Sequence, residues 1–169
     1  MSFLELARDR YSVRNFQDRP VEPRLLNEIL EAGRIALTAH NDQPQRIKII
    51  TDPVELAKVD ECTRCRFGAQ TVLLVCYDKD VCWRRKFDDA PSGEIDAAIV
   101  TTHIILAAYE AGVGTCWVMY FDPVKTTELF GLPENIVPVA FLPMGYPSED
   151  STPAGFHDKR ISLEEMLLK

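Results

Sequence analysis

The sequence has no long hydrophobic run and no signal-peptide pattern at its start. No stretch approaches the ~18 consecutive apolar residues of a membrane span. Residues 1–10 alternate apolar and charged positions, whereas a signal peptide places a continuous apolar centre after a basic start. We therefore expect a cytoplasmic protein with no membrane partner.

Positive charge is also scarce. Lys and Arg total 19 against 26 Asp and Glu, which gives a formal net charge of −7. An acidic surface repels a phosphate backbone, so we expect no nucleic-acid partner. A local basic cluster can still bind a small phosphate, because attraction at contact distance depends on near neighbours. The glycine signatures G-x-G-x-x-G and G-x-x-x-x-G-K-[ST] are both absent, so neither a dinucleotide fingerprint nor a P-loop is indicated.

Cysteine is present but in no complete metal-site pattern. The five cysteines are Cys62, Cys65, Cys76, Cys82 and Cys116. The odd count and the lack of a signal peptide favour reduced thiols. Cys62 and Cys65 form a C-x-x-C, but a zinc site would need a second pair or nearby histidines. We favour incidental thiols and predict no metal site, with a metal or redox role for this pair as the alternative.

Length and periodicity predict one domain of mixed secondary structure. The 169 residues, 46% of them hydrophobic, suffice for a single domain over residues 1–169, and no repeat or flexible linker divides them. Helices are predicted over 2–9, from Pro20–Pro23 to about Ala36, and over 53–59, 93–111, 123–130 and 162–168. Strands are predicted over 46–50, 71–77, 115–119 and 136–142, with loops over 37–44 and 78–91. The order ααβαβαβαβα indicates an α+β or mixed α/β fold.

The helix predicted over 93–111 is the most apolar one, so we expect it at the centre of the molecule. Ser92 is a candidate cap at its start, and Gly112 and Gly114 end it. Ser2 is likewise a candidate cap of the first helix, and Ser162 with Glu165 fits a capping box in the last. Residues that form an apolar face on the central helix are Ile95, Ala98, Ile99, Thr102, Ile105, Leu106 and Tyr109.

The first cluster that could bind a ligand is Arg10-Tyr11-Ser12-Val13-Arg14. Two guanidinium groups can each hold a pair of phosphate oxygens, and the serine hydroxyl adds a further donor. Taken alone the pattern is weak, because paired surface arginines and loop serines are common.

Three further clusters are each ambiguous alone. His40-Asn41-Asp42-Gln43-Pro44 supplies amide donors and acceptors suited to the edge of a planar heterocycle, but it also fits a polar turn. Gly112-Val113-Gly114-Thr115-Cys116-Trp117 permits close approach to a flat ligand, but it also fits a helix end followed by a strand. Met144-Gly145-Tyr146-Pro147 fits a turn, and Lys159-Arg160 beyond it fits a solvated pair.

Together, and in this order, the four clusters resemble the FMN-dependent nitroreductase family over nearly the whole chain. Residues 10–16 are similar to that family's R-x-S-[VI]-R-x-[FY], and residues 41–44 to its N-x-Q-P. Residues 112–117 resemble its G-[LV]-G-[TS]-C-W, and residues 137–147 its V-P-x-x-x-x-x-x-G-Y-P. The resemblance implies an α+β nitroreductase-like fold, a central mixed and mostly antiparallel sheet flanked by helices, in a homodimer with shared flavin sites.

The resemblance also implies which residues bind the cofactor. Arg10, Ser12 and Arg14, with Tyr11 between them, would hold the phosphate and ribityl end of FMN. Lys159 and Arg160 would approach that phosphate from the C-terminal segment. Two more groups complete the implied site: Thr38, Ala39, Asn41 and Gln43 on the flavin of the other subunit, and Val118, Met119 and Tyr120 near the isoalloxazine ring.

The implied activity is that of an NAD(P)H oxidoreductase. NADH or NADPH would give hydride to flavin N5, and a small electron acceptor such as a nitroaromatic, a quinone or a flavin would then take its place in a ping-pong scheme. No side chain need act as acid or base, which suits a sequence with three histidines and no triad-like arrangement. A different flavin reaction on the same fold, or a flavin-binding module that acts as a sensor or store, remains an alternative.

Overall fold

The structure, a computed structural model, describes residues 2–168, so Met1 and Lys169 at the ends of the predicted domain lie outside it. The predicted order ααβαβαβαβα is confirmed, with one 3₁₀ helix added in the loop before the first strand. The elements are α1 (Phe3–Asp9), α2 (Pro23–Arg34), η1 (Ala39–Asn41), β1 (Gln45–Ile50), α3 (Pro53–Cys62), β2 (Thr71–Asp78), α4 (Gly93–Glu110), β3 (Gly114–Thr115), α5 (Pro123–Phe130), β4 (Ile136–Gly145) and α6 (Leu163–Met166).

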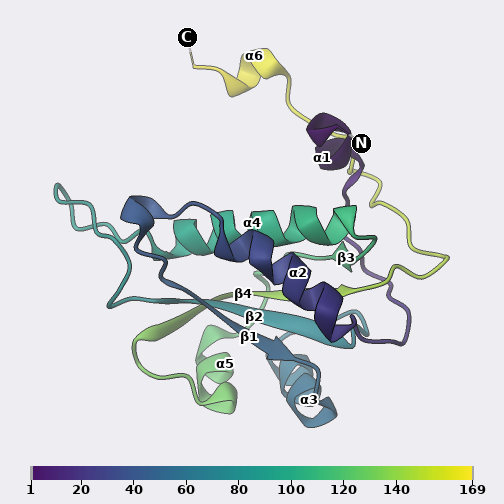
Figure 1. Cartoon of the computed structure of the whole chain (residues 1–169), viewed down its shortest axis with the longest axis horizontal. Helices are drawn as coiled ribbons and strands as arrows, with labels where there is room; N and C mark the ends of the chain where they lie inside the picture. The colour runs from purple at the N-terminus through teal and green to yellow at the C-terminus, as the bar shows by residue number, and fades with distance from the viewer. Residues whose placement is uncertain (1, 169) are drawn as a thin grey trace.

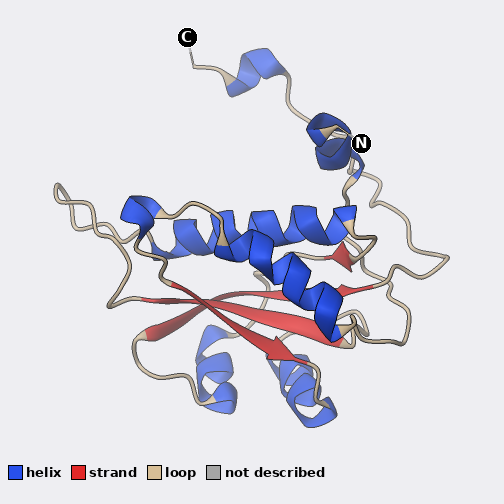
Figure 2. Cartoon of the chain, in the orientation of Figure 1, coloured by secondary structure: helices blue, strands red, loops and turns tan. Residues whose placement is uncertain are grey.

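A four-stranded sheet in the order β1-β2-β4-β3 forms the middle layer, and all three strand pairings are antiparallel. A single parallel bridge, between Ser12 and Thr115, adds the mixed character that was expected. Helices α2 and α4 cover one face of the sheet, and α3 and α5 cover the other (Figure 1). Because both faces are covered, every residue of β2 is buried. Helix α1 contacts α4, whereas α6 stands clear of these layers (Figure 2).

The last part of the predicted strand 115–119 does not continue the sheet, and β3 contains only Gly114 and Thr115. Beyond it Cys116 N–H still donates to the Pro143 carbonyl at 3.1 Å. Proline has no N–H, so Pro143 cannot return the second hydrogen bond of that antiparallel pair. The regular ladder is interrupted there, and only an isolated bridge between Val118 and Phe141 follows.

Helix α4 is central, as predicted, but it is apolar on two sides. The side that packs on the sheet and α2 consists of residues that are fully buried: Ala97, Val100, Ile104 and Ala108. The predicted apolar face lies mostly on the opposite side, where Ile95 is 64% exposed and Thr102 is exposed. The prediction thus identified an apolar face but not the one that the chain's own core buries. No helix within residues 2–168 has both the length and the apolarity of a membrane span.

The predicted helix ends are confirmed in three cases and differ in one. Ser2 and Ser162 each accept a hydrogen bond from the backbone in a capping box, and Gly112 follows α4 with a φ of 75°. Ser92 occupies the position before α4, but its hydroxyl makes no capping bond. It donates instead to the carboxylate of Asp96 at 2.6 Å.

An aromatic cluster anchors α5 against the sheet. Phe141 on β4 is 0% exposed, and its ring lies edge-on to Phe121 at 5.4 Å and tilted to Phe130 at 6.3 Å between centroids. Such pairs add to the free energy gained by burying the rings themselves. Phe87, in the loop between β2 and α4, is by contrast 97% exposed.

We expect Phe141→Ala to lower the free energy of unfolding by ~3–5 kcal/mol, because it removes a buried ring and leaves a cavity. The matched control, Phe87→Ala, should change it by less than ~0.5 kcal/mol, since the ring is exposed. Urea denaturation followed by circular dichroism measures both. Equal losses in the two variants would contradict this account of the core.

Candidate functional site

The arginine segment, residues 10–14, runs beside β3, and this pairing decides which side chains face outward. Val13 N–H donates to the Thr115 carbonyl at 2.9 Å. Side chains alternate in extended chain, so Val13 is buried while Arg14 on the next position is exposed. The close approach needs a glycine at position 114, where a Cβ atom would lie 2.5 Å from Cγ2 of Val13.

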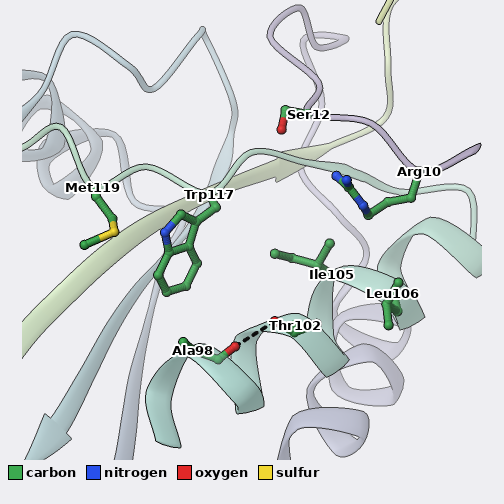
Figure 3. Close-up of a pocket in the computed structure, with 8 residues that line it drawn as sticks. All are labelled: Arg10, Ser12, Ala98, Thr102, Ile105, Leu106, Trp117 and Met119. Atoms are coloured by element: carbon green, nitrogen blue, oxygen red, sulfur yellow. Dashed lines mark hydrogen bonds between the residues drawn. The ribbon is translucent and has the colours of Figure 1, made fainter. Parts of the chain in front are cut away.

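A cavity of about 510 Å³, here called the large cavity, lies between the arginine segment, α4 and the chain that follows β3 (Figure 3). This volume lies within the range of roughly 300–1,000 Å³ for cofactor and ligand pockets. Figure 3 shows Arg10 and Met119 on opposite sides of the cavity, with α4 residues beneath them. The lining residues are Arg10, Ser12, Ala98, Thr102, Ile105, Leu106, Trp117 and Met119.

A second cavity of about 140 Å³, here called the small cavity, adjoins the large one, because Arg10 and Ser12 line both. Its other wall is the C-terminal segment, which contributes Arg160. Lys159 lines neither cavity and is exposed. The small cavity is lined by Arg10, Tyr11, Ser12, Arg14, Ala154, Phe156, His157 and Arg160.

Two long-range contacts hold the C-terminal segment over the arginine segment. The Tyr11 hydroxyl donates to the Ser151 carbonyl at 3.3 Å, and His157 Nε2 lies 3.1 Å from the Arg8 carbonyl. The Tyr11 and His157 rings also meet edge to face, with 6.4 Å between centroids. These contacts explain how residues about 150 positions apart come to share one cavity.

The arginines of the small cavity have no acidic partner. None of Arg10, Arg14 and Arg160 forms a salt bridge within the described range of residues 2–168. Elsewhere in the chain, Arg34 lies 2.6 Å from the carboxylate of Glu31, and Arg66 lies 2.7 Å from that of Asp60. Three guanidinium groups without carboxylates in an acidic chain leave N–H donors and positive charge for an anionic ligand.

Two buried thiols, Cys116 beside Ser12 and Arg14 and Cys76 on β2, are protonated at neutral pH. Burial raises the pKa of the Cys116 thiol, and the nearby Arg14 guanidinium opposes part of that rise. Burial also raises the pKa of Cys76 to about 12. Such thiols are poor nucleophiles and poor metal ligands. Cys62 is buried and Cys65 half-buried, and residues 2–168 contain no cluster of three His, Cys, Asp or Glu side chains that could hold a metal ion.

The segment Val118–Tyr120 turns away from the sheet at the edge of the large cavity. Val118 is buried, and its N–H donates to the Phe141 carbonyl at 2.9 Å. Met119 and Tyr120 are 64% and 67% exposed, and Met119 alone of the three lines the large cavity. Within residues 2–168 the amides of Met119 and Tyr120 have no acceptor, so these two N–H groups are available to a ligand.

The loop Thr38–Gln43 lies at the other end of α4. Ala39 N–H donates to Asp96 in the first turns of that helix, whereas Arg10 shares the large cavity with Leu106. Ten residues separate positions 96 and 106, which is about 15 Å of helix. None of the loop residues Thr38, Ala39, Asn41 and Gln43 lines either cavity of the same chain. Their contact with a flavin held by another subunit stays a prediction.

Several lining residues were assigned no cofactor role in the sequence analysis. Trp117 belongs to a motif that was recognised, but its indole was given no part in the site. Ala98, Thr102, Ile105 and Leu106 were recognised only as an apolar helix face. The available signal was that α4 is apolar all round, which indicates that something besides the core covers its second side. Nothing in the sequence pointed to Phe156 or His157.

Comparisons with known proteins agree with this architecture. A sequence model of the Nitroreductase family matches residues 7–67 and 61–146. A Methanothermobacter thermautotrophicus protein assigned as an NADH dehydrogenase/NAD(P)H nitroreductase is 29% identical, covering 98% of this chain and 88% of that protein. A nitroreductase family protein from Clostridium difficile 630 is 41% identical with a TM-score of 0.93, covering 99% of this chain and 98% of that chain. An Exiguobacterium sibiricum 255-15 protein is described as a nitroreductase in complex with FMN. Its structure has a TM-score of 0.85, and the match covers 100% of this chain and 97% of that chain. Because the identity is 18%, this likeness shows the fold alone.

Proposed function

Since the chain belongs to the nitroreductase family, we propose that it is an FMN-dependent NAD(P)H oxidoreductase that passes electrons to a small acceptor. One observation carries the proposal: three arginines without acidic partners in residues 2–168 line a small cavity that shares Arg10 and Ser12 with a larger, mainly apolar one. A phosphorylated planar cofactor needs this combination of an anion site and an adjoining apolar slot.

The residues around the small cavity fit a phosphate group. Arg10, Arg14 and Arg160 supply charge-assisted donors, and the Ser12 hydroxyl adds another. Tyr11 acts differently, because its hydroxyl is already bonded to Ser151 and holds the C-terminal segment in place. Lys159 is exposed outside both cavities, and its contact with the phosphate stays a prediction.

The large cavity fits the isoalloxazine ring. Trp117 and the α4 side chains form apolar walls, and Met119 lines the same cavity. The amides of Met119 and the adjacent Tyr120 have no acceptor within residues 2–168. When bound, FMN supplies hydride acceptance at N5 from NADH or NADPH and onward transfer to an acceptor in a ping-pong cycle. We assign the hydrogen bond to the reactive edge of the ring to Met119 or Tyr120, because the Val118 amide is committed to Phe141.

A homodimer with shared sites is part of the proposal. The second apolar side of α4 is open in the single chain, and Ile95 on it is 64% exposed. Helix α6 stands clear of the body with Leu163 and Met166 66% and 62% exposed (Figure 1). Exposed apolar surface of this kind marks a protein interface. A two-fold arrangement would cover both regions and bring the loop with Asn41 and Gln43 to the partner's flavin.

The first test concerns the cofactor and the reaction. We expect the purified protein to be yellow, with about one FMN per chain, and we expect NADH or NADPH to bleach the flavin absorbance under anaerobic conditions. A spectrum that NADH and NADPH both leave unchanged would favour a flavin-binding module over an enzyme. A colourless protein that FMN does not reconstitute would contradict the whole proposal. Adding nitroaromatics, quinones or free flavins to the reduced protein then identifies the acceptor.

The second test concerns the phosphate. Arg10→Ala should weaken FMN binding by about 1.5–3 kcal/mol, which is typical of a lost hydrogen bond to a charged group. The matched control is Arg34→Ala, which makes the same charge change on α2 at a residue that pairs with Glu31. Flavin fluorescence titration measures both affinities. The assignment is wrong if the double variant Arg10→Ala, Arg14→Ala binds FMN as tightly as the unmodified protein.

The third test concerns assembly. We expect a dimer at low micromolar concentration in sedimentation velocity, with more than ~2,000 Å² of surface buried between the two chains. Removal of FMN should shift the equilibrium toward monomer, because a ligand held by both chains stabilises the assembled state. A stable monomer that retains FMN and oxidises NADH would contradict the shared-site arrangement.

A further inference from the structure

A buried carboxylate stands where the loop Thr38–Gln43 meets α4. Asp96 is 1% exposed, and its Oδ1 accepts a hydrogen bond from Ala39 N–H at 2.8 Å. Its Oδ2 accepts a second from the Ser92 hydroxyl at 2.6 Å. Burying a carboxylate is costly unless it is hydrogen-bonded, so both contacts hold Asp96 in a defined orientation. No salt bridge to Asp96 occurs in the described part of the chain.

The loop that Asp96 holds is strained at the positions expected to contact flavin. His40, Asn41 and Gln43 have φ values of 53°, 59° and 50°, in the left-handed region that side-chain-bearing residues adopt at a cost. Such conformations persist only where surrounding contacts enforce them. Within the loop, Asn41 N–H donates to the Thr38 carbonyl at 3.0 Å, and Gln43 N–H donates to the hydroxyl of Thr38 at 3.1 Å. The Ala39 bond to Asp96 is the contact that ties the loop to α4.

The loop's polar side chains face outward. Asn41 and Gln43 are both exposed, and within residues 2–168 the Gln43 amide nitrogen donates to one acceptor, the Asn41 carbonyl at 3.2 Å. The loop is strained, is hydrogen-bonded to Asp96 of α4, and leaves its side-chain amides in solvent. Such a loop is suited to bind a ligand that another subunit holds. Asp96 is the group beneath it.

We propose that Asp96 is a positioning residue for the flavin site of the partner subunit: its carboxylate fixes Ala39 and thereby the left-handed path that presents Asn41 and Gln43. The inference rests on the proposed function, since it assumes FMN and a shared site. Asp96 itself touches no cofactor in this arrangement. Its effect reaches the flavin through the backbone of residues 39–43.

Three variants separate this role from general stability. Asp96→Ala removes both bonds and should weaken FMN binding by about tenfold or more. Asp96→Asn should restore most of that affinity, because its amide oxygen can accept from Ala39 while its NH₂ donates to the Ser92 oxygen. Ser92→Ala removes only the bond at Oδ2 and should leave FMN affinity within about twofold of the unmodified value. Hydrogen exchange of the Ala39 amide should be fast in Asp96→Ala and slow in the other two.

A hybrid dimer tests whether the effect crosses the interface. One chain carries Arg10→Ala with Arg14→Ala, the other carries Asp96→Ala, and two affinity tags isolate the mixed species. In the shared-site arrangement both lesions fall on the same site, so the other site is intact and the hybrid should hold about one FMN per dimer. If Asp96 acted on its own chain's flavin, each site would carry one lesion and the hybrid would lose FMN from both.

The outcomes distinguish this inference from the proposed function. Loss of FMN from both sites of the hybrid, or normal FMN affinity in Asp96→Ala, overturns the positioning role while the unmodified protein still binds FMN. A failure of Asp96→Asn to restore affinity despite a folded chain also overturns it. An unmodified protein that binds no FMN overturns the proposed function itself.

Discussion

Helix α4 has to bury two apolar sides, and the sheet of its own chain covers only one. The covered side carries small and branched residues such as Ala97 and Val100, which let the helix approach the sheet closely. Gly33 of α2 lets that helix approach as well, since a Cβ there would lie 2.7 Å from Ile104. The second side forms the floor of the large cavity near one end and stays open near the other. One helix therefore contributes both to the core and to the large cavity.

The charge distribution follows a similar division. The chain is acidic overall, and most of its arginines lie beside carboxylates on the surface, where such pairs contribute little to stability. The small cavity, by contrast, is lined by three arginines that form no salt bridge within residues 2–168: Arg10, Arg14 and Arg160. Net charge thus describes what the molecule repels at a distance, while attraction at contact depends on near neighbours such as these three arginines.

The two ends of α4 contact different segments of the chain. Near its C-terminal end the helix faces the arginine segment, and near its N-terminal end Asp96 holds the strained loop with Asn41 and Gln43. The Asp96 contact lies about 15 Å of helix away from Leu106, which shares the large cavity with Arg10. In the arrangement proposed above, a two-fold dimer would bring the loop of one chain to the arginine segment of the other.

The sequence by itself determined the element order, the capping residues Ser2 and Ser162, and which candidate residues stand together along the chain, because these depend on local spacing and on neighbouring residue types. It did not determine where β3 stops, since that required knowing that Pro143 lies opposite Cys116. Nor did it determine which side of α4 faces the core, because a helix that is apolar all round has no directional pattern. The meeting of Arg160 with Arg10 and the tie from Asp96 to Ala39 join residues far apart in the chain. Only the tertiary structure decided these contacts, because packing sets the distance between segments that no local spacing relates.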